Sequence, residues 1–277
     1  HAAPAAAGGR LQYLSTYHLR SNDYYSSRNY ASRLIGRTLV FYTPLFLPPG
    51  TTELRHVLPG MRKWDPARPD AEFKPTVQAR RIYRPPVPLD PASVPALHTV
   101  TRCELPQGEL ICMSSALLAP SARVSYVSPT ASYIWSTYAS KRGDTASGIL
   151  YRLPLDGSHP RAVRVRGAPF DQFSFLEGTD GYLNVLTGTR ANSEWMWRAE
   201  FATGHIRLFR MPLNAFGDGR SAAAGATYRH LGIAQEPSIQ NRFVGERVEP
   251  RRVVEDEAAR EGGAAAEPDE HDRPPGR

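Results

Sequence analysis

From residue 122 onward the sequence repeats one arrangement, in which short alternating apolar runs are separated by turn residues. The runs are ARVSYVSPTASYIWSTY (122–138), GILYRLPLDG (148–157), RAVRVRGAP (161–169), DQFSFLEGTDGYLNVLTGT (171–189), GHIRLFRMPLNAFGDG (204–219) and TYRHLGIAQ (227–235), and another unit starts at IQNRFVGERV (239–248). Four short strands per unit of about 40 to 50 residues are typical of β-propeller blades. The spacing therefore predicts an all-β fold, a partial β-propeller of four-stranded antiparallel blades.

Composition agrees with many short elements. The 25 Pro and 22 Gly are spread through the 277 residues without a fixed period, which disfavours long helices. A hydrophobic content of 41% is sufficient for a buried core. A β-sandwich is the competing arrangement, because it also consists of many short strands.

An earlier blade is expected between residues 10 and 119. RLQYLSTYHL (10–19) is a plausible strand, and YASRLIGRTLVFYTPLF (30–46) indicates a hairpin around Gly36-Arg37, with Leu39, Phe41 and Leu45 on one side. Residues 47–96 are rich in Pro and lack periodicity. We interpret them as a long irregular insertion with a single strand at VQARRIY (77–83).

The only two cysteines lie in a predicted hairpin, ALHTVTRCELPQGELICMSSALLA (96–119). If Gln107-Gly108 forms a two-residue loop, pairing outward places Cys103 directly opposite Cys112, at a pair without mutual hydrogen bonds. Cβ atoms at such a pair lie about 4.5 to 5.5 Å apart, near the range of a disulfide. We therefore predict a Cys103–Cys112 disulfide and an oxidising compartment; two buried thiols are the alternative.

Composition also divides the chain. HAAPAAAGGR opens with an Ala/Gly/Pro linker (1–9) that lacks the basic and apolar regions of a signal peptide. Blades are expected over 10–248. Residues 249–277 contain no aromatic residue and many charged ones, so we expect a disordered charged tail. No apolar run reaches the roughly 18 residues that a membrane-spanning helix needs.

The formal net charge of +7 does not by itself indicate a nucleic-acid partner. Lys63, Lys74 and Lys141 are the only lysines among 34 basic residues, and the arginines are not clustered. The densest basic stretch is QARRIYRPP (78–86), which we interpret as a solvated loop in preference to a polyanion site.

Three phrases resemble a known family. YASRLIGRTLVFYTP, FDQFSFLEGTDGYLNVLTG and QNRFVGE occur in the order seen in the bacterial secreted C-terminal β-propeller domain family, over roughly residues 10–246 without the insertion. The resemblance implies an exported, envelope-associated propeller, located in the periplasm, in the outer envelope or outside the cell. It transfers no catalytic residue. Relatives continue in blade sequence after NRFVG, so this chain looks like a truncated or frame-altered member.

Signals of chemistry are weak. The eight histidines are isolated in sequence, no zinc, nucleotide or nucleophile-elbow motif is present, and the catalytic residues stay unknown, with no metal or cofactor expected. Trp195 and Trp197 share one face of a predicted strand and are candidate ligand-stacking residues, although such pairs more often pack between blades. Asp180, in Thr179-Asp180-Gly181, is interpreted as a turn residue.

Three functions stay open. The first is a non-catalytic exported β-propeller, an interaction or scaffold module for an unknown protein or envelope polymer. The second is a hydrolase or oxidoreductase with a site at the central channel mouth, where the acidic loop residues are Asp144, Asp171, Glu177 and Asp180. The third is a polyanion or envelope-polymer binder that uses the arginine surplus.

The cysteine pairing can be checked directly. We expect a thiol assay on the denatured, unreduced protein to find no free thiol, because both sulfur atoms are bonded to one another. The same assay after reduction should find both. Two thiols before reduction would contradict the pairing.

Overall fold

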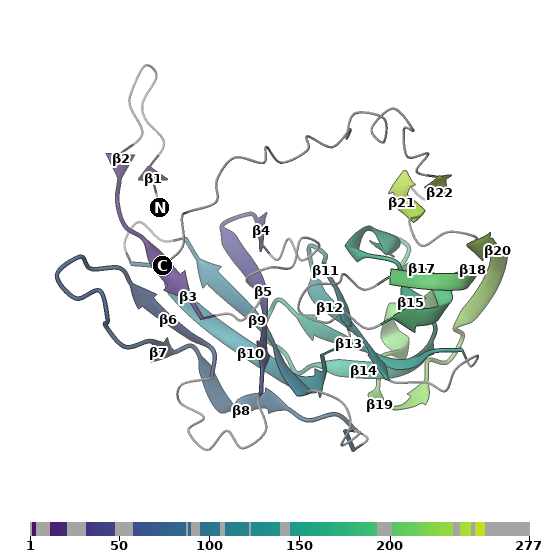
Figure 1. The fold of residues 1–277 in the computed structure, drawn as a ribbon, viewed down its shortest axis with the longest axis horizontal. Helices are drawn as coiled ribbons and strands as arrows, with labels where there is room; N and C mark the ends of the chain where they lie inside the picture. The colour runs from purple at the N-terminus through teal and green to yellow at the C-terminus, as the bar shows by residue number, and fades with distance from the viewer. Residues whose placement is uncertain are drawn as a thin grey trace, which may run out of the picture.

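The computed structural model describes most of the chain before residue 252. The described residues are 2–3, 12–20, 32–47, 58–86, 88–89, 95–105, 109–121, 123–138, 145–192, 201–234, 239–244 and 247–252. Within them the regular structure is β-strand, with two single-turn 3-10 segments and no α-helix (Figure 1). The predicted all-β class is confirmed at this level.

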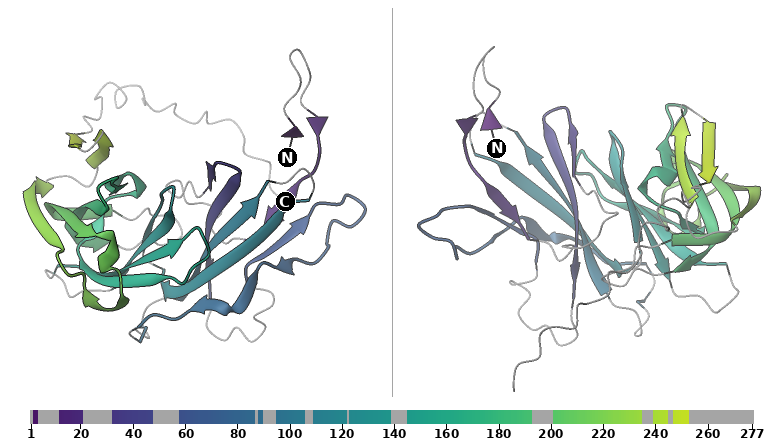
Figure 2. Two further views of the ribbon diagram at one scale, coloured as in Figure 1. Left: turned by 180° about the vertical axis from the view of Figure 1, so that it is seen from behind. Right: turned by 45° about the horizontal axis from the view of Figure 1, so that its top comes forward.

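Three large sheets follow one another along the chain, and they lie side by side in the same order (Figures 1 and 2). The first sheet has the order β4 (Ser32–Ile35), β5 (Thr38–Phe46), β9 (Pro95–Glu104), β10 (Ile111–Pro120), β8 (Val77–Tyr83). The middle sheet has the order β11 (Arg123–Val127), β12 (Ala131–Tyr138), β13 (Ser147–Pro154), β14 (Arg161–Arg166), β19 (Asp218–Ala222). The third sheet has the order β15 (Ala168–Pro169), β17 (Tyr182–Asn192), β18 (Phe201–Pro212), β20 (Thr227–Ala234), with β16 (Phe175–Glu177) also paired to β17.

Smaller elements complete the described structure. The short strands are β1 (Ala2–Ala3) with β2 (Gln12–Tyr13), β3 (Tyr17–Leu19) with β6 (Gly60–Lys63) and β7 (Lys74–Pro75), and β21 (Ile239–Val244) with β22 (Arg247–Arg252). The 3-10 segments are η2 (Gln172–Ser174) and η3 (Leu213–Ala215). β22 extends to Arg252, so the first residues assigned to the tail are paired; residues 253–277 lie outside the described residues.

Each large sheet is an antiparallel meander, and two of them carry an added parallel strand. β8 lies parallel to β10, and it comes from the insertion within its own sheet. β19 lies parallel to β14, but it comes from the connection between β18 and β20 of the third sheet. The insertion is therefore more ordered than predicted: VQARRIY is a strand as expected, and β6 and β7 are further strands within it.

The middle sheet is packed on both faces. On one face Ile134, Ile149 and Tyr151 pack against Val40 and Leu117 of the first sheet. On the other face a second cluster joins it to the third sheet, through Tyr133, Trp135, Leu150, Val163, Phe175, Leu183, Val185, Phe209 and Met211. Trp135 is fully buried, and its Nε1–H donates to the Gly167 carbonyl at 3.1 Å. Every residue from Ala131 to Thr137 is buried for this reason.

The cysteine hairpin has the predicted register. Cys103 pairs with Cys112 across β9 and β10, the two are disulfide-bonded, and their Cα atoms are 4.1 Å apart. Cys103 is fully buried, and Cys112 Sγ lies 3.3 Å from the Met61 sulfur of β6. The disulfide therefore lies between the first sheet and the small sheet of β3, β6 and β7.

In β5, Val40, Tyr42 and Leu45 are buried, whereas Leu39 and Phe41 are partly exposed. One strand assignment was wrong. Phe173 was expected in a strand, but it lies in η2 and is 56% exposed. The Asp171 side chain accepts from the Phe173 N–H, which caps a 3-10 turn where the alternation indicated a strand.

The first strands of the three sheets converge. Arg33 of β4 donates to Gln172 of η2, with Nη2 2.9 Å from Oε1, although 139 positions separate them. Tyr126 of β11 stacks on Phe175 of β16, with ring centroids 5.4 Å apart and an interplanar angle of 9°. Residues from all three sheets therefore meet at one place, close to the opening strand of each.

Replacing Trp135 tests the two-sided packing. We expect Trp135→Ala to lower the free energy of unfolding by about 3 to 5 kcal/mol, because the cavity it leaves lies between sheets that cannot close on it. Urea unfolding at neutral pH measures the change. Leu34→Ala on β4 is the control, since Leu34 is 61% exposed. Equal effects from the two substitutions would contradict the packing scheme.

Candidate functional site

Asp180 lies in the turn between β16 and β17, as the sequence predicts. The Tyr182 N–H donates to Asp180 Oδ1 at 3.1 Å, and the Gly178 N–H donates to the Tyr182 carbonyl at 2.8 Å. Gly181 has φ +80°, a conformation that disfavours residues with a Cβ atom. The Asp-Gly pair is therefore required by the reversal itself.

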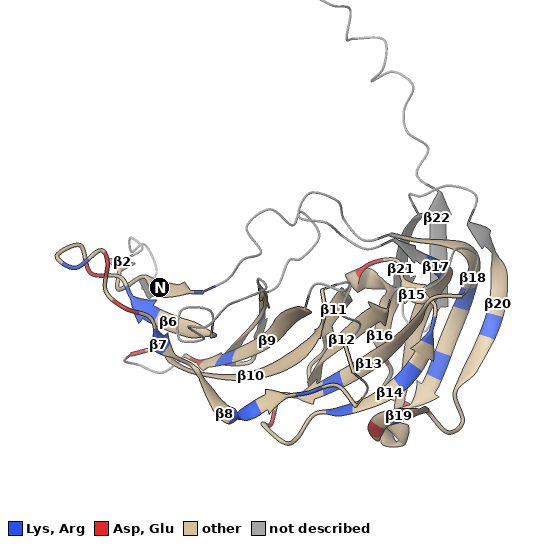
Figure 3. Ribbon diagram, turned by 60° about the horizontal axis from the view of Figure 1, so that its bottom comes forward, with Lys and Arg blue, Asp and Glu red and all other residues tan. Residues whose placement is uncertain are grey.

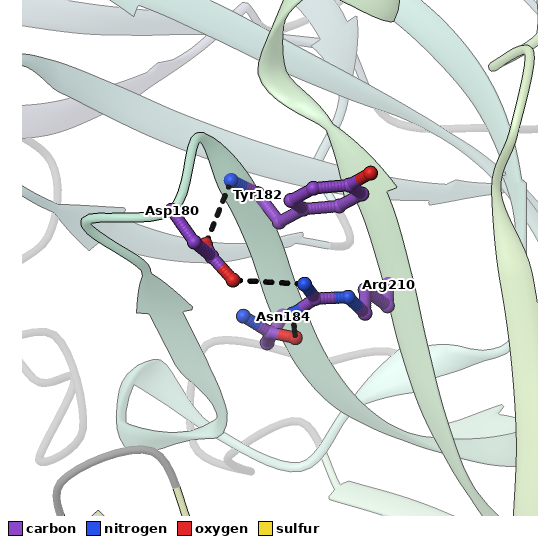
Figure 4. Close-up of polar contacts among 4 residues, drawn as sticks. All are labelled: Asp180, Tyr182, Asn184 and Arg210. Carbon is purple, nitrogen blue, oxygen red and sulfur yellow. Dashed lines mark hydrogen bonds and ion pairs between the residues drawn. The ribbon is translucent and has the colours of Figure 1, made fainter.

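The same carboxylate also fixes Arg210 of β18 (Figure 4). Asp180 Oδ2 lies 2.8 Å from Arg210 Nη2, and Arg210 Nη1 donates to Asn184 Oδ1 at 3.0 Å. The guanidinium lies over the Tyr182 ring, 4.0 Å from its centroid. The hydrogen bond from Arg210 is the main reason that the pKa of Asp180 is lowered. The cluster holds the ends of β17 and β18 together, and both oxygens of the Asp180 carboxylate accept hydrogen bonds within it.

Glu177 is surrounded by hydroxyl groups from the middle sheet. Ser128 Oγ and the Tyr133 hydroxyl each lie 2.6 Å from Oε2, and Thr130 Oγ1 lies 2.6 Å from Oε1. Arg152 completes the group by donating to the Tyr133 hydroxyl and to Thr130 Oγ1, both at 3.2 Å. Burial, together with the hydrogen bond to Glu177, raises the pKa of Tyr133. The Glu177 cluster thus links β16 to the loop between β11 and β12.

The three acidic loop residues of the predicted channel mouth that the structure describes have separate partners. Asp171 caps η2, Glu177 lies in its hydroxyl cluster, and Asp180 pairs with Arg210. Asp144 lies outside the described residues. Across the described ranges, no group of three or more His, Cys, Asp or Glu residues is suited to a metal ion.

A basic cavity of about 920 Å³ lies where the outer strands of the middle and third sheets meet. Its lining comes from β12, β13, β14, β18, β19 and β20: Tyr138, Ser147, Gly148, Ile149, Arg164, Val165, Arg166, Arg207, Arg220, Ser221, Ala222, Tyr228 and His230. Figure 3 shows Lys and Arg positions on β14, β18 and β20 in this region. Four of the lining residues are arginines and none is acidic.

Three of these arginines have no carboxylate partner in the part of the chain that the structure describes. Among the described residues, Arg164, Arg166 and Arg207 form no ion pair, while Arg220 Nε lies 3.7 Å from Asp218 Oδ2 at an exposed position. Tyr228 joins the two sheets, because the Arg166 N–H donates to its hydroxyl at 2.9 Å. Burial raises the pKa of Tyr228, and the nearby charges of Arg166 and Arg207 oppose that increase. The cavity is therefore a region of uncompensated positive charge.

Sequence reasoning missed this cavity. It considered only QARRIYRPP as a basic segment and preferred a solvated loop there; residues 77–83 form the expected strand β8, and Arg81 donates to the Gly157 carbonyl at 3.1 Å. The cavity arginines come from separate runs. The sequence pattern that could have indicated the cavity is the alternation of Arg164 and Arg166 with the buried residues Val163 and Val165 along β14.

Two histidines that are distant in sequence meet beside the cavity. His205 Nδ1 lies 3.1 Å from His230 Nε2, so one ring nitrogen must accept and the other donate. His98, by contrast, is buried, with the Tyr42 hydroxyl and the Pro120 carbonyl as partners, each at 2.8 Å. Trp195 and Trp197, the candidate stacking pair, lie outside the described residues.

Comparison with known proteins adds no relative: no protein-family model, curated protein or solved structure matches the chain. Among the described residues, no helix has the length and apolar character needed to cross a membrane.

The Asp180–Arg210 pair predicts a pH effect. Because the pKa of Asp180 is lowered on folding from its ordinary value of 3.8, its contribution to stability is present above that pH and is lost as the pH falls through the folded value. We expect Asp180→Asn to reduce the urea midpoint at about pH 7 and to have a smaller effect at about pH 2 to 3. Repeating both measurements in an Arg210→Met background is the control. An equal loss at both pH values would contradict the assignment.

Proposed function

We propose that this chain is an exported, non-catalytic module of β-propeller type, which acts by binding a partner. Three antiparallel meanders follow one another in chain order, and the middle one packs against both neighbours. The contacts of Arg33 with Gln172 and of Tyr126 with Phe175 bring the opening strands together. Blades around a central axis have this arrangement, with the first strand of each blade innermost.

The observation that carries the non-catalytic part is the position of Glu177. A catalytic carboxylate must reach substrate, yet both oxygens of Glu177 accept hydrogen bonds from hydroxyls of the fold at 2.6 Å. Asp171 and Asp180 are likewise bound to neighbouring backbone N–H groups. These contacts favour a structural role for the acids proposed for the channel mouth.

Export is supported by the disulfide and by the resemblance to secreted propeller domains. A disulfide such as Cys103–Cys112 persists where the surroundings are oxidising and is rare in reducing cytosol. One of its sulfur atoms, Cys112 Sγ, also lies 3.3 Å from the Met61 sulfur of the small sheet. We place the protein in the periplasm, in the outer envelope or outside the cell.

Glu177→Gln separates structure from catalysis. We expect it to lower the free energy of unfolding by about 1 to 3 kcal/mol, because the new amide opposes hydroxyl donors that a carboxylate accepts. Wild-type and variant chains, screened against esters, glycosides and phosphoesters with metal content measured, should both show no turnover. An activity in the wild type that Glu177→Gln abolishes without unfolding the chain would overturn the non-catalytic proposal.

A further inference from the structure

We propose that the open basic cavity along the outer strands of the middle and third sheets binds an extended anionic polysaccharide, a linear polymer of sugars that carry carboxylate, sulfate or phosphate groups. The site rests on the proposed function as a binding module, and it gives that module a ligand class. Arg164, Arg166 and Arg207 are the anchoring cations.

The expected negative charge of the ligand follows from the lack of carboxylate partners for these arginines in the described part of the chain. Guanidinium groups are held permanently positive, and three of them lie around one cavity without an ion pair in the described part of the chain. Water screens part of the repulsion between these exposed groups, but like charges around one cavity still favour binding of an anion over a cation. The planar fork of Arg matches the oxygen pairs of carboxylate, sulfate and phosphate groups.

The spread of the cations indicates several anionic groups in one ligand. Arg164 and Arg166 are two positions apart on β14, and alternate residues of a strand lie about 6 to 7 Å apart. Arg207 comes from β18 of the other sheet. A volume of about 920 Å³ lies near the upper end of the roughly 300 to 1,000 Å³ of ligand sites. A single oxyanion would contact only part of this lining.

The surface between the cations suits sugar rings. Tyr138 and Tyr228 contribute aromatic surface to the same cavity. Tyr228 accepts a hydrogen bond from the Arg166 backbone N–H at 2.9 Å, so its ring is fixed next to β14. Amphipathic rings next to charges fit a polymer with alternating ring faces and anionic groups. The disulfide places this surface in an oxidising compartment, which favours a polysaccharide over nucleic acid.

Heparin oligosaccharides provide the test, with the full, disulfide-intact chain. By calorimetry we expect a heparin decasaccharide to bind at least tenfold more tightly than the disaccharide, with affinity falling as salt rises. Arg164→Gln combined with Arg207→Gln should weaken decasaccharide binding at least tenfold and reduce the salt slope by about two. The matched control is Arg80→Gln with Arg84→Gln, which removes the same charge from exposed positions near β8 and should change affinity little.

Each other outcome has a defined meaning, provided that melting temperatures show all variants folded. Equal weakening by the control pair would show general charge attraction and overturn the cavity site. Binding of inorganic sulfate or the disaccharide as tightly as the decasaccharide would overturn the extended ligand. Tighter binding of single-stranded DNA of matched charge would overturn the polysaccharide. Absence of heparin binding would overturn this inference alone, because the turnover screen judges the non-catalytic module separately.

Discussion

Burial of the middle sheet on both faces is the constraint on which the rest of the structure depends. A sheet with one wet face tolerates polar residues at every second position, but β12 is buried from Ala131 to Thr137. Ser132 even retains a buried hydroxyl without a hydrogen-bond partner among the described residues. Apolar contact with the first and third sheets supplies the free energy that offsets the burial of such a group. Each sheet therefore depends on its neighbour to cover its apolar face.

Charged side chains that link the sheets lie toward the strand ends. Glu177 and Arg33 act there, where water reaches part of each side chain and charged groups keep some solvation. The position of Glu177, which the sequence suggested as a possible catalytic acid, is thus set by the packing of the sheets. The outer edge differs, because Arg164 and Arg207 border a hollow and have no packing partner of opposite charge in the described ranges.

Local features were predictable from the sequence and non-local ones were not. Strand positions and the Cys103–Cys112 register depend on alternation and on one turn, so counting residues from Gln107-Gly108 was sufficient. Phe173 was misassigned because the capping side chain of Asp171 outweighs alternation over a few residues. The basic cavity and the His205–His230 contact depend on how β14, β18 and β20 meet, which no local pattern encodes. The assignment of the three sheets as blades of a partial β-propeller stays a prediction.

The crossing of β19 has a consequence for the order in which the protein is made. β14 leaves the ribosome well before Asp218–Ala222, because β17 and β18 lie between them in the chain. During synthesis the edge of β14 therefore waits unpaired, and an unpaired strand edge readily joins another chain. Exposed Arg161, Arg164 and Arg166 on that strand place repulsive charges on each nascent copy. The arginines that border the mature cavity are thus charges of the kind that disfavour pairing of an open strand edge with another chain before β19 joins it.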